Sequence, residues 1–332
     1  MSALSGRKVF VTGADGFIGS HLVELLVRSG AEVRALVYYN SWNAIGWLAD
    51  VPADVLRQVE IVTGDVRDAE RIKGAIAGRS HVFHLASLIG IPYSYEAPRS
   101  YLETNVGGAL NVLEACRRSD TLERVIHTST SEVYGSAQTV PIAETHPLVG
   151  QSPYSATKIA ADKLAESYHL SFGLPIVVAR PFNTFGPRQT ARAVIPTIAG
   201  QLLSGVKALK LGALTPTRDF NYVTDTAAGF IALAQSSGAE GEVVNIGTGR
   251  EWSIEETARL LMRAVGREVP IECEESRVRP AASEVNRLIA DNRKIKAKTA
   301  WAPQVAFEEG LARTADWIRR NLDRFDTGRY AV

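Results

Sequence analysis

Tyr154 and Lys158 are the two residues whose types and spacing point most directly to chemistry. They stand four positions apart at the start of a segment with helical periodicity. On a helix this spacing places both side chains on one face, with Cβ atoms about 5–6 Å apart. At that separation an ammonium group favours the phenolate form of a tyrosine, which is a general base. An amphipathic helix with an aromatic residue and a cation on the same side would show the same pattern.

The segment before this helix has the features of a strand end. Residues 122–128 read as a buried strand and lead into the small and polar sequence Ser-Thr-Ser-Glu, 129–132. The strand end is therefore expected to bring Thr130, Ser131 and Glu132 close to the first turn of the helix. Because ligands of α/β proteins bind at the carboxyl ends of strands, we expect a reaction site here.

A glycine pattern near the N-terminus predicts a second functional feature. The apolar, β-branched run 8–12 is followed by Gly-x-x-Gly-x-x-Gly at 13–19 and then by a helical pattern. In this context the glycines give a tight turn and close approach for a pyrophosphate, and the helix N-terminus points free N–H groups at the anion. Dinucleotide binding is therefore favoured over a purely structural turn. The residues predicted to contact the cofactor here are Gly13, Asp15, Gly16, Phe17, Ile18 and Gly19.

The ends of the following strands complete the predicted cofactor site. The second strand, 32–37, ends in Tyr-Tyr-Asn-Ser and lacks the acidic residue that usually holds the adenosine ribose. No carboxylate there repels a 2′-phosphate and no arginine follows to bind one, so NAD is predicted, with NADP as a close alternative. Asp65 either accepts from the adenine amino group or caps a helix. The other predicted cofactor contacts are Asn40, Val66, Leu85, Ala86 and Ser87.

Strands and helices alternate along the first half of the chain. This order predicts an α/β fold with a doubly wound parallel sheet of the Rossmann type. After residue 181 the alternation weakens, although 243–246 reads as a strand that returns to the main sheet. We expect a dinucleotide-binding domain of residues 1–181 plus a returning segment at about 219–250. A smaller, discontinuous C-terminal α+β substrate domain would comprise 182–218 and 251–332.

The composition is that of an ordinary globular protein. The 332 residues are 45% hydrophobic and 22% charged, with a formal net charge of +1. No basic excess suggests nucleic acid, and no apolar run approaches the ~18 residues of a membrane span. Cys116 and Cys273 lack metal-ligand spacing and fit free thiols in a reducing compartment better than a disulfide. A cytoplasmic protein without a metal site is expected.

Taken in order along the chain, these motifs resemble the extended short-chain dehydrogenase/reductases of the NAD-dependent epimerase/dehydratase family. The resemblance spans nearly the whole length. It rests on the glycine turn, Asp65, Leu85-Ala86-Ser87, Asn105, Ser129-Thr130, Tyr154-x-x-x-Lys158 and Arg180-Pro-x-Asn183. The resemblance also implies that Asn105, Tyr154 and Lys158 contact the cofactor.

Two short motifs distinguish branches of that family. Its epimerases tend to carry a small triplet after the central strand, whereas its hexose 4,6-dehydratases carry Thr-Asp-Glu or Thr-Ser-Glu. With Thr130-Ser131-Glu132, this chain resembles nucleotide-sugar 4,6-dehydratases of the GDP-mannose dehydratase type. Its Arg279-Pro280-x-x-Ser283-Glu284-Val285 is also similar to dehydratases of the legionaminic-acid pathway, which act on a nucleotide-linked N-acetylglucosamine.

The resemblance implies roles for the four residues of the reaction site. Tyr154 takes the proton of the substrate C4 hydroxyl, Thr130 hydrogen-bonds the C4 oxygen, and Lys158 lowers the tyrosine pKa and holds the nicotinamide ribose. Glu132 removes the C5 proton after C4 has been oxidised. Where glucose dehydratases place an aspartic acid, this chain has Ser131, so Glu132 or a bound water must protonate the leaving hydroxyl.

The substrate and partners follow from the same resemblance. The implied substrate is an NDP-hexose, with UDP- or GDP-N-acetylglucosamine as candidates, and guanidinium forks suit its diphosphate. The implied assembly is a homodimer formed through helices 105–118 and 154–171. A nucleotide-sugar 4-epimerase, which needs no Glu132, and an NAD(P)-binding redox regulator are the alternatives. The predicted substrate contacts are Ser131, Asn183, Arg188, Arg218 and Arg279, and each arginine could instead form a surface salt bridge.

Overall fold

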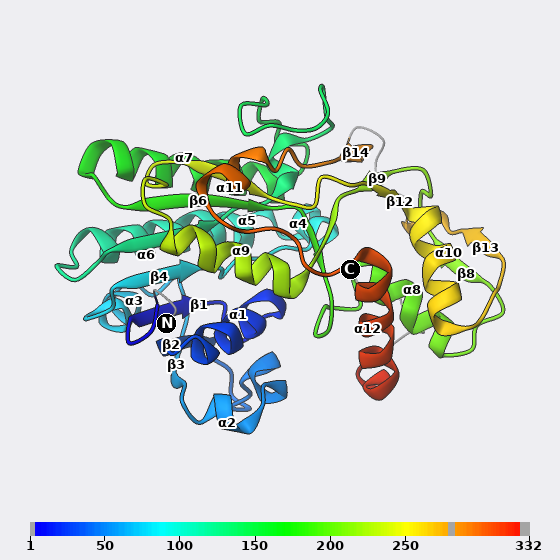
Figure 1. The fold of residues 1–332 in the computed structure, drawn as a ribbon, viewed down its shortest axis with the longest axis horizontal. Coiled ribbons are helices and arrows are strands. Elements are labelled where there is room, and N and C mark those ends of the chain that lie inside the picture. Colours follow the sequence, from blue (N-terminus) through cyan, green and yellow to red (C-terminus); the bar gives the residue numbers. More distant parts are fainter. Residues whose placement is uncertain (1–3, 278–282, 326–332) are drawn as a thin grey trace.

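A seven-stranded parallel sheet forms the centre of the computed structural model, which describes residues 4–277 and 283–325 (Figure 1). The strand order is β11-β6-β5-β4-β1-β2-β3. The chain starts in the middle of the sheet, builds one edge as far as β3 and then returns to β4, so the sheet is doubly wound. The strands are β1 (Lys8–Thr12), β2 (Glu32–Tyr38), β3 (Glu60–Gly64), β4 (His81–His84), β5 (Arg124–Thr128), β6 (Ile176–Pro181) and β11 (Val243–Ile246).

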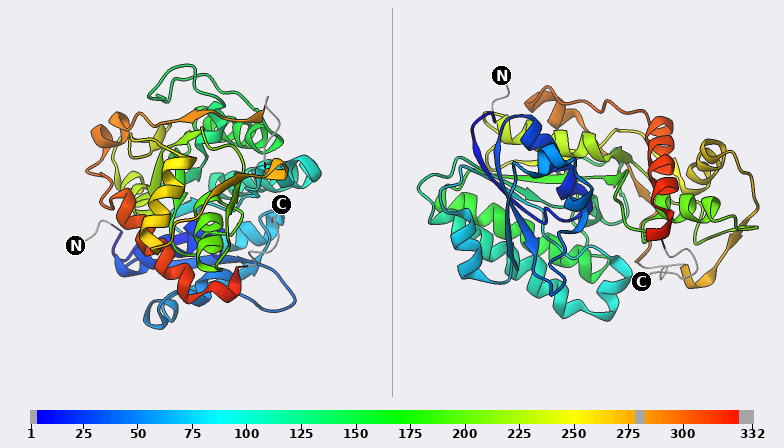
Figure 2. Two further views of the ribbon diagram at one scale, coloured as in Figure 1. Left: turned by 90° about the vertical axis from the view of Figure 1, so that its right-hand side faces the viewer. Right: turned by 90° about the horizontal axis from the view of Figure 1, so that it is seen from below.

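Helices cover both faces of this sheet, as Figure 2 shows. On one face, Leu22 of α1 and Phe230 of α9 share a buried cluster with Val11 of β1. On the other face, Ala165 of α7 shares a cluster with Phe10, the neighbour of Val11 that points to the opposite side. The helices of this part are α1 (Phe17–Arg28), α2 (Ala53–Leu56), α3 (Ala69–Ile76), α4 (Ile91–Glu96), α5 (Pro98–Tyr101), α6 (Gly108–Arg117), α7 (Pro153–Phe172) and α9 (Val223–Gln235).

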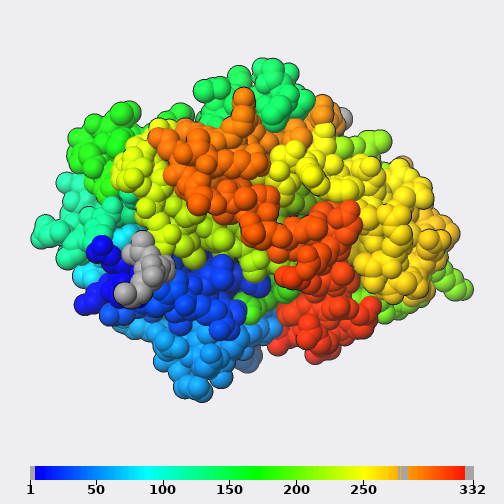
Figure 3. Space-filling model, in the orientation of Figure 1, coloured from blue at the N-terminus to red at the C-terminus, as the bar shows by residue number. Residues whose placement is uncertain are grey.

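A second hydrophobic core lies at the other end of the molecule, where α8, α10 and α12 pack together through Ile198, Leu261 and Leu311. Figure 3 shows α12 (red) beside α10 (yellow) on one face. The fold class is therefore confirmed, while the domain boundaries stay a prediction. The elements outside the main sheet are β7 (Asn183–Phe185), α8 (Val194–Leu203), β8 (Leu209–Leu211), β9 (Thr217–Arg218), β10 (Phe220–Tyr222), β12 (Trp252–Ser253), α10 (Ile254–Val265), β13 (Ile271–Cys273), β14 (Arg287–Leu288), α11 (Arg293–Lys298) and α12 (Phe307–Arg320).

The helix expected over 105–118 differs from the observed one. A π-helix (Leu102–Gly107) comes first, and α6 begins only at Gly108. Asn105 lies within the π-helix and makes hydrogen bonds to Leu88 and Thr157, which are distant in sequence. Hydrophobic periodicity cannot reveal such a turn, because those bonds join different elements. Single π-helical turns are common at functional sites.

Membrane spans, metal sites and cysteines can be described for this part of the chain. Within residues 4–277 and 283–325, no helix is long and apolar enough to cross a membrane. In the same ranges, no group of three His, Cys, Asp or Glu side chains could hold a metal ion. Both cysteines are free thiols, with Cys116 buried and Cys273 exposed.

Candidate active site

The glycine turn between β1 and α1 leaves little room for side chains. Gly13 has a positive φ of 65°, and a Cβ there would lie 2.8 Å from the backbone nitrogen of Ala86. A Cβ on Gly19 would lie 2.0 Å from the Gly13 carbonyl oxygen. A Cβ on Gly16, the N-cap of α1, would approach the same oxygen at 3.2 Å. The turn is a bare backbone cradle before a helix N-terminus, which fits the pyrophosphate of a dinucleotide.

The carboxylate of Asp15 lies at the end of β2, where the strand itself supplies no acidic residue. Its Oδ2 accepts a 3.1 Å hydrogen bond from the backbone N–H of Tyr38. Burial raises the pKa of Asp15, and its backbone hydrogen bonds oppose that effect. The glycine turn thus places a carboxylate beside the position where this type of site holds the adenosine ribose.

Asn40, a predicted cofactor contact, uses its side chain to close its own loop. Its Nδ2 donates to the carbonyl oxygens of Tyr38 and Ala44, at 3.1 and 2.8 Å. Its Oδ1 accepts from the Ala44 N–H at 3.0 Å. Because both N–H groups of its side-chain amide bind within the loop, Asn40 stabilises the conformation of the loop that follows β2. A direct contact with the cofactor stays a prediction.

Asp65 does not cap a helix. Its carboxylate binds the guanidinium of Arg67 at 2.6 Å, and this hydrogen bond lowers the pKa of Asp65. The N-cap of α3 is Asp68, which accepts from the Arg71 N–H at 3.0 Å. The capping interpretation of Asp65 is therefore wrong, and its contact with adenine stays a prediction. The neighbouring Val66 is buried in the core beneath α3 and α6.

The loop after β4 is held by a buried hydroxyl. Thr12 Oγ1 accepts from the N–H groups of Leu85 and Ala86, at 3.1 and 3.0 Å. The same oxygen lies 2.9 Å from Nδ1 of His84. Since Thr12 already accepts two hydrogen bonds, its own proton is directed to Nδ1. Burial keeps the pKa of His84 well below its usual value, so the ring is neutral, with its proton on Nε2.

Asn105 connects this loop to α7. Its Oδ1 accepts from the Ser87 hydroxyl at 2.9 Å, and its Nδ2 donates to the Thr157 hydroxyl at 3.1 Å. Thr157 precedes Lys158 on α7. The buried amide therefore positions the β4 loop against the helix that carries the predicted base. Contacts of Ser87 and Asn105 with the cofactor stay predictions.

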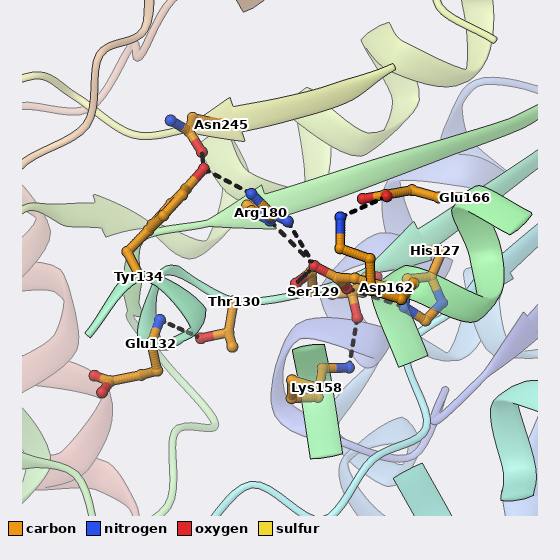
Figure 4. Close-up of polar contacts among 12 residues, drawn as sticks. His127, Ser129, Thr130, Glu132, Tyr134, Lys158, Asp162, Glu166, Arg180 and Asn245 are labelled. Atoms are coloured by element: carbon orange, nitrogen blue, oxygen red, sulfur yellow. Dashed lines mark hydrogen bonds and ion pairs between the residues drawn. The ribbon is translucent and has the colours of Figure 1, made fainter. Parts of the chain in front are cut away.

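The segment after β5 carries two of the four predicted reaction residues, Thr130 and Glu132 (Figure 4). Thr130 is the N-cap of a short 3-10 helix (Ser131–Tyr134), and its hydroxyl accepts from the Glu132 N–H at 3.2 Å. Ser131 is buried. The Glu132 side chain is half-buried and points away from the buried polar groups of the sheet.

The first turn of α7 meets this segment. Ser152 and Ser155 form a capping box, which fixes where the helix begins and places Tyr154 in its first turn. Tyr154 is 7% exposed, and Thr130 hydrogen-bonds its side chain. The charge of Glu132 also acts on the tyrosine. The structure thus brings Thr130, Glu132 and Tyr154 together at one strand end.

The expected effect of Lys158 on Tyr154 is not found. Burial raises the pKa of Tyr154, the hydrogen bond with Thr130 opposes this, and the charge of Glu132 adds to it. Lys158 Nζ donates to the carbonyl oxygen of Thr128 at 2.7 Å. The expectation of a lowered tyrosine pKa is therefore wrong for this arrangement, because burial is the largest effect on the phenol and the ammonium of Lys158 is directed to the Thr128 carbonyl oxygen. Burial also lowers the pKa of Lys158 to about 8, and the charge of Asp162 opposes this.

The predicted substrate contacts lie in different surroundings. Asn183 is on β7, and its Oδ1 has no hydrogen-bond partner within the described residues. Arg218 is on β9 and pairs with Glu284 at 3.2 Å. Arg279 lies outside the described residues.

Arg188 is engaged inside the protein. It is 7% exposed, and its guanidinium donates to the Ser20 hydroxyl, the Glu24 carboxylate and the Asp50 carbonyl oxygen. These partners belong to α1 and the segment after β2. The salt-bridge alternative therefore describes Arg188 better than a diphosphate contact, although the pair is buried rather than on the surface.

Sequence periodicity did not single out Asp162, a fully buried residue next to this site. It follows Lys158 by four residues on α7 and accepts hydrogen bonds from Ser129 and Arg180, at 2.7 and 2.9 Å. The available signal was the continued four-residue spacing of Tyr154, Lys158 and Asp162, which places all three on one helix face.

Comparison with known proteins finds similar sequences along nearly the whole chain. A family model described as GDP-mannose 4,6 dehydratase matches residues 10–314. A dTDP-glucose 4,6-dehydratase from Actinoplanes is 34% identical over 321 residues, which cover 95% of this chain and 98% of that protein.

Solved structures with the same fold include dehydratases and epimerases. A dTDP-glucose 4,6-dehydratase from Streptomyces venezuelae, solved with NAD bound, superposes with a TM-score of 0.86 and 31% identity, covering 97% of this chain and 100% of that one. A UDP-N-acetylglucosamine 4-epimerase from Methanobrevibacter ruminantium gives a TM-score of 0.86 and 29% identity, covering 96% and 99%. The overall fold is therefore shared by both reaction types.

Proposed function

Because the chain belongs to the GDP-mannose 4,6-dehydratase family of NAD-dependent epimerases and dehydratases, we propose that it is a nucleotide-sugar 4,6-dehydratase. NAD is its cofactor. The observation that carries the proposal is the position of Glu132, which lies two residues after the Thr130 cap, donates its N–H to the Thr130 hydroxyl and acts electrostatically on Tyr154. Elimination of water needs a base beside the oxidised carbon, whereas 4-epimerisation does not.

Each proton of the reaction is assigned to a side chain. As a phenolate, Tyr154 takes the proton of the C4 hydroxyl, and Thr130 hydrogen-bonds the same oxygen. When bound beside the glycine turn, NAD would supply the hydride acceptor for C4 and the hydride donor for C6. Glu132 removes the C5 proton, which the adjacent 4-keto group has made acidic, while the C6 hydroxyl leaves as water. As the hydride reaches C6, C5 takes up one proton, which balances the proton that Tyr154 removed from the C4 hydroxyl, so the net change is the loss of one water.

Protonation of the leaving hydroxyl is assigned to Glu132 as well. Ser131 occupies the position next to it, and a serine hydroxyl is a poor acid at neutral pH. Glu132 is the one acidic side chain between residues 129 and 134. Once it has taken the C5 proton, the same carboxyl is the acid available to the C6 oxygen.

The proposed substrate is an NDP-hexose, with UDP- and GDP-N-acetylglucosamine as the candidates favoured by the Ser283-Glu284-Val285 motif. Asn183 and Arg218 are the proposed diphosphate contacts among the described residues, and Arg279 is a third outside them. The partnerless Oδ1 of Asn183 is an acceptor and so suits a hydroxyl of the substrate, whereas its Nδ2 is the atom that would donate to the diphosphate. These residues fall in the proposed substrate domain, 182–218 and 251–332, beside the proposed dinucleotide domain, 1–181 and 219–250.

Mass spectrometry of products tests this proposal directly. The purified protein is mixed with UDP-, GDP-, CDP- and dTDP-hexoses, with and without a 2-acetamido group. Dehydration is expected to lower the product mass by one water for at least one sugar. An unchanged mass with a changed sugar configuration would support a 4-epimerase, and NAD binding without turnover of any sugar would support a redox regulator.

We also propose a homodimer formed through α6 and α7. Four large apolar side chains on and next to these helices are exposed, which is unusual for surfaces that face only water. They are Leu102, Leu110, Leu170 and Phe172, with exposures of 54%, 40%, 82% and 54%.

A further inference from the structure

Buried side chains attach the reaction segment to α7 at one end and to the sheet at the other (Figure 4). At one end, the hydroxyl of Ser129 donates to Asp162 Oδ2 at 2.7 Å. At the other end, the hydroxyl of Tyr134 donates to Asn245 Oδ1 at 2.7 Å. Thr130 and Glu132 lie between these two attachment points.

One buried ion pair joins the two attachments. The guanidinium of Arg180 donates to Asp162 Oδ2 through Nε and Nη2, at 3.1 and 2.9 Å. Its Nη1 donates to the Tyr134 hydroxyl at 3.1 Å, and its Cζ lies 4.9 Å from the centre of the Tyr134 ring. Arg180 therefore contacts Asp162, which holds the Ser129 end of the segment, and Tyr134, which forms the other end.

Water does not compete for these contacts. Ser129, Tyr134, Asp162, Arg180 and Asn245 are all between 0% and 4% exposed. In such surroundings hydrogen bonds between charged and polar groups are strong, and a polar group that loses its partner is costly to keep buried. The contacts come from α7, β6 and β11, so they fix the segment relative to three elements at once.

We propose that Asp162 and Arg180, with Tyr134 and Asn245, form a clamp that positions Thr130 and Glu132 for the reaction. The clamp residues are positioning residues, since their polar groups are directed at one another beneath the reaction site. The expected loss of kcat for dehydration rests on the proposed dehydratase function. The expected hydrogen exchange of residues 129–135 does not.

Asp162 also acts on Lys158 through its charge. Asp162 is the next residue on the same face of α7, and its carboxylate opposes the effect of burial, which together leave the lysine pKa lowered to about 8. The other titratable groups that face Lys158 are His84 of β4 and His127 of β5, and burial lowers the pKa of each. Asp162 is therefore the group whose removal should lower the charge on Lys158 near neutral pH.

Hydrogen exchange followed by mass spectrometry tests the clamp independently of any reaction. The variants are Asp162→Asn and Tyr134→Phe, each of which keeps the side-chain shape and removes a clamp contact. Exchange of the amides of 129–135 should accelerate by about tenfold or more, the effect of losing about one hydrogen bond of support. The backbone bonds that report it include Ser129 N–H to Ala179 and Gly135 N–H to Glu132.

Two matched controls lie on α7. Glu166→Gln removes a carboxylate that pairs with Lys163, and Tyr168→Phe removes a hydroxyl that donates to Glu114. Both should leave exchange of 129–135 at the wild-type rate. Asp162→Asn leaves a buried guanidinium short of its counter-ion, so this variant is the harder one to fold. If it is insoluble, Tyr134→Phe carries the test.

Two further readouts separate a clamp from general destabilisation. In Asp162→Asn, the pH above which NAD affinity declines should move to a lower value, whereas Glu166→Gln should keep the wild-type pH dependence. In Tyr134→Phe, kcat for dehydration should fall by about 10–100-fold, as for a misplaced catalytic group, with little change in KM.

Unchanged exchange of 129–135 in the folded clamp variants would overturn the proposal, whatever reaction the protein performs. If exchange accelerates but the wild-type protein epimerises its sugar, the clamp stands and the dehydratase assignment fails. Wild-type kcat in Tyr134→Phe, together with dehydration by the wild type, would remove the positioning role.

Discussion

At the residue scale, burial decides the protonation states at the start of α7. Tyr154 and Lys158 are 7% and 5% exposed, and loss of hydration disfavours the charged form of each. The tyrosine pKa is raised, and the lysine pKa is lowered to about 8. A phenol of raised pKa is a strong base once it has lost its proton. The ammonium of Lys158, by contrast, is only partly populated at mildly alkaline pH.

NAD binding should therefore weaken as the pH rises through about 8. Lys158 is mainly an ammonium below its lowered pKa and mainly a neutral amine above it, so its charged contact with the nicotinamide ribose is lost with rising pH. Calorimetric titration of NAD across this range measures the effect. Lys158→Met should bind NAD more weakly and show no such decline, and a wild-type affinity that stays constant through pH 8 would contradict the assignment.

Asp15 should set the preference for NAD over NADP. Its carboxylate lies beside the Tyr38 N–H, where a 2′-phosphate would meet a second negative charge. Asp15→Asn keeps the size and the hydrogen-bond acceptor, so NADP affinity should rise by about tenfold relative to NAD affinity. Asp68→Asn is the control, because asparagine also caps α3. Equal discrimination in wild type and Asp15→Asn would show that another group selects the cofactor.

At the element scale, the β1–α1 turn suits a pyrophosphate because its glycines have no side chains. Gly16→Val should abolish retention of NAD through purification, because the new side chain would occupy the surface that the pyrophosphate approaches. The chain should still fold, since a Cβ at Gly16 meets the Gly13 oxygen at a tolerable 3.2 Å. Gly74→Val on α3, where a Cβ meets no atom within 4 Å, is the matched control. Undiminished NAD in Gly16→Val would refute the assignment of this turn.

Local sequence determined some elements well and others poorly. β1 occupies Lys8–Thr12 as expected, because four residues of strand-forming type follow Lys8 and lead directly into the glycines. Ser253 caps α10 through a capping box with Glu256, a pattern that three residues of local sequence carry. The π-helix at Leu102–Gly107 was missed, since hydrogen bonds of Asn105 to other elements accompany it.

At the scale of the whole molecule, the sequence predicted the doubly wound sheet and the reaction segment but not the contacts that hold them together. Thr130, Glu132, Tyr154 and Lys158 were recognisable because short-range spacing encodes them. The link from Asp15 to Tyr38 spans 23 residues, and the one from Tyr134 to Asn245 spans 111. Only the folded chain brings such partners together.

The proposed homodimer is also a property of the whole molecule. Light scattering should give about twice the chain mass of 36.0 kDa at micromolar protein, because the exposed apolar residues of α6 and α7 would be buried between subunits. Leu110→Asp should shift the protein to monomers, since a carboxylate is costly to bury. Trp42→Asp, at a residue 87% exposed in the loop after β2, should remain dimeric. A monomeric wild-type protein would refute the proposal.

Glu132→Gln provides the most direct measurement of the central claim, that this side chain is the C5 base. Glutamine keeps the size and hydrogen bonding but cannot take the proton, so dehydration should fall by about 10²–10⁴. Oxidation at C4 should survive, and reduced nicotinamide should accumulate as an absorbance change after mixing with the substrate. Tyr154→Phe should instead leave the nicotinamide oxidised, and Glu123→Gln, at an exposed partner of Arg7, should behave as wild type. Dehydration by Glu132→Gln at the wild-type rate would contradict the account and favour the 4-epimerase.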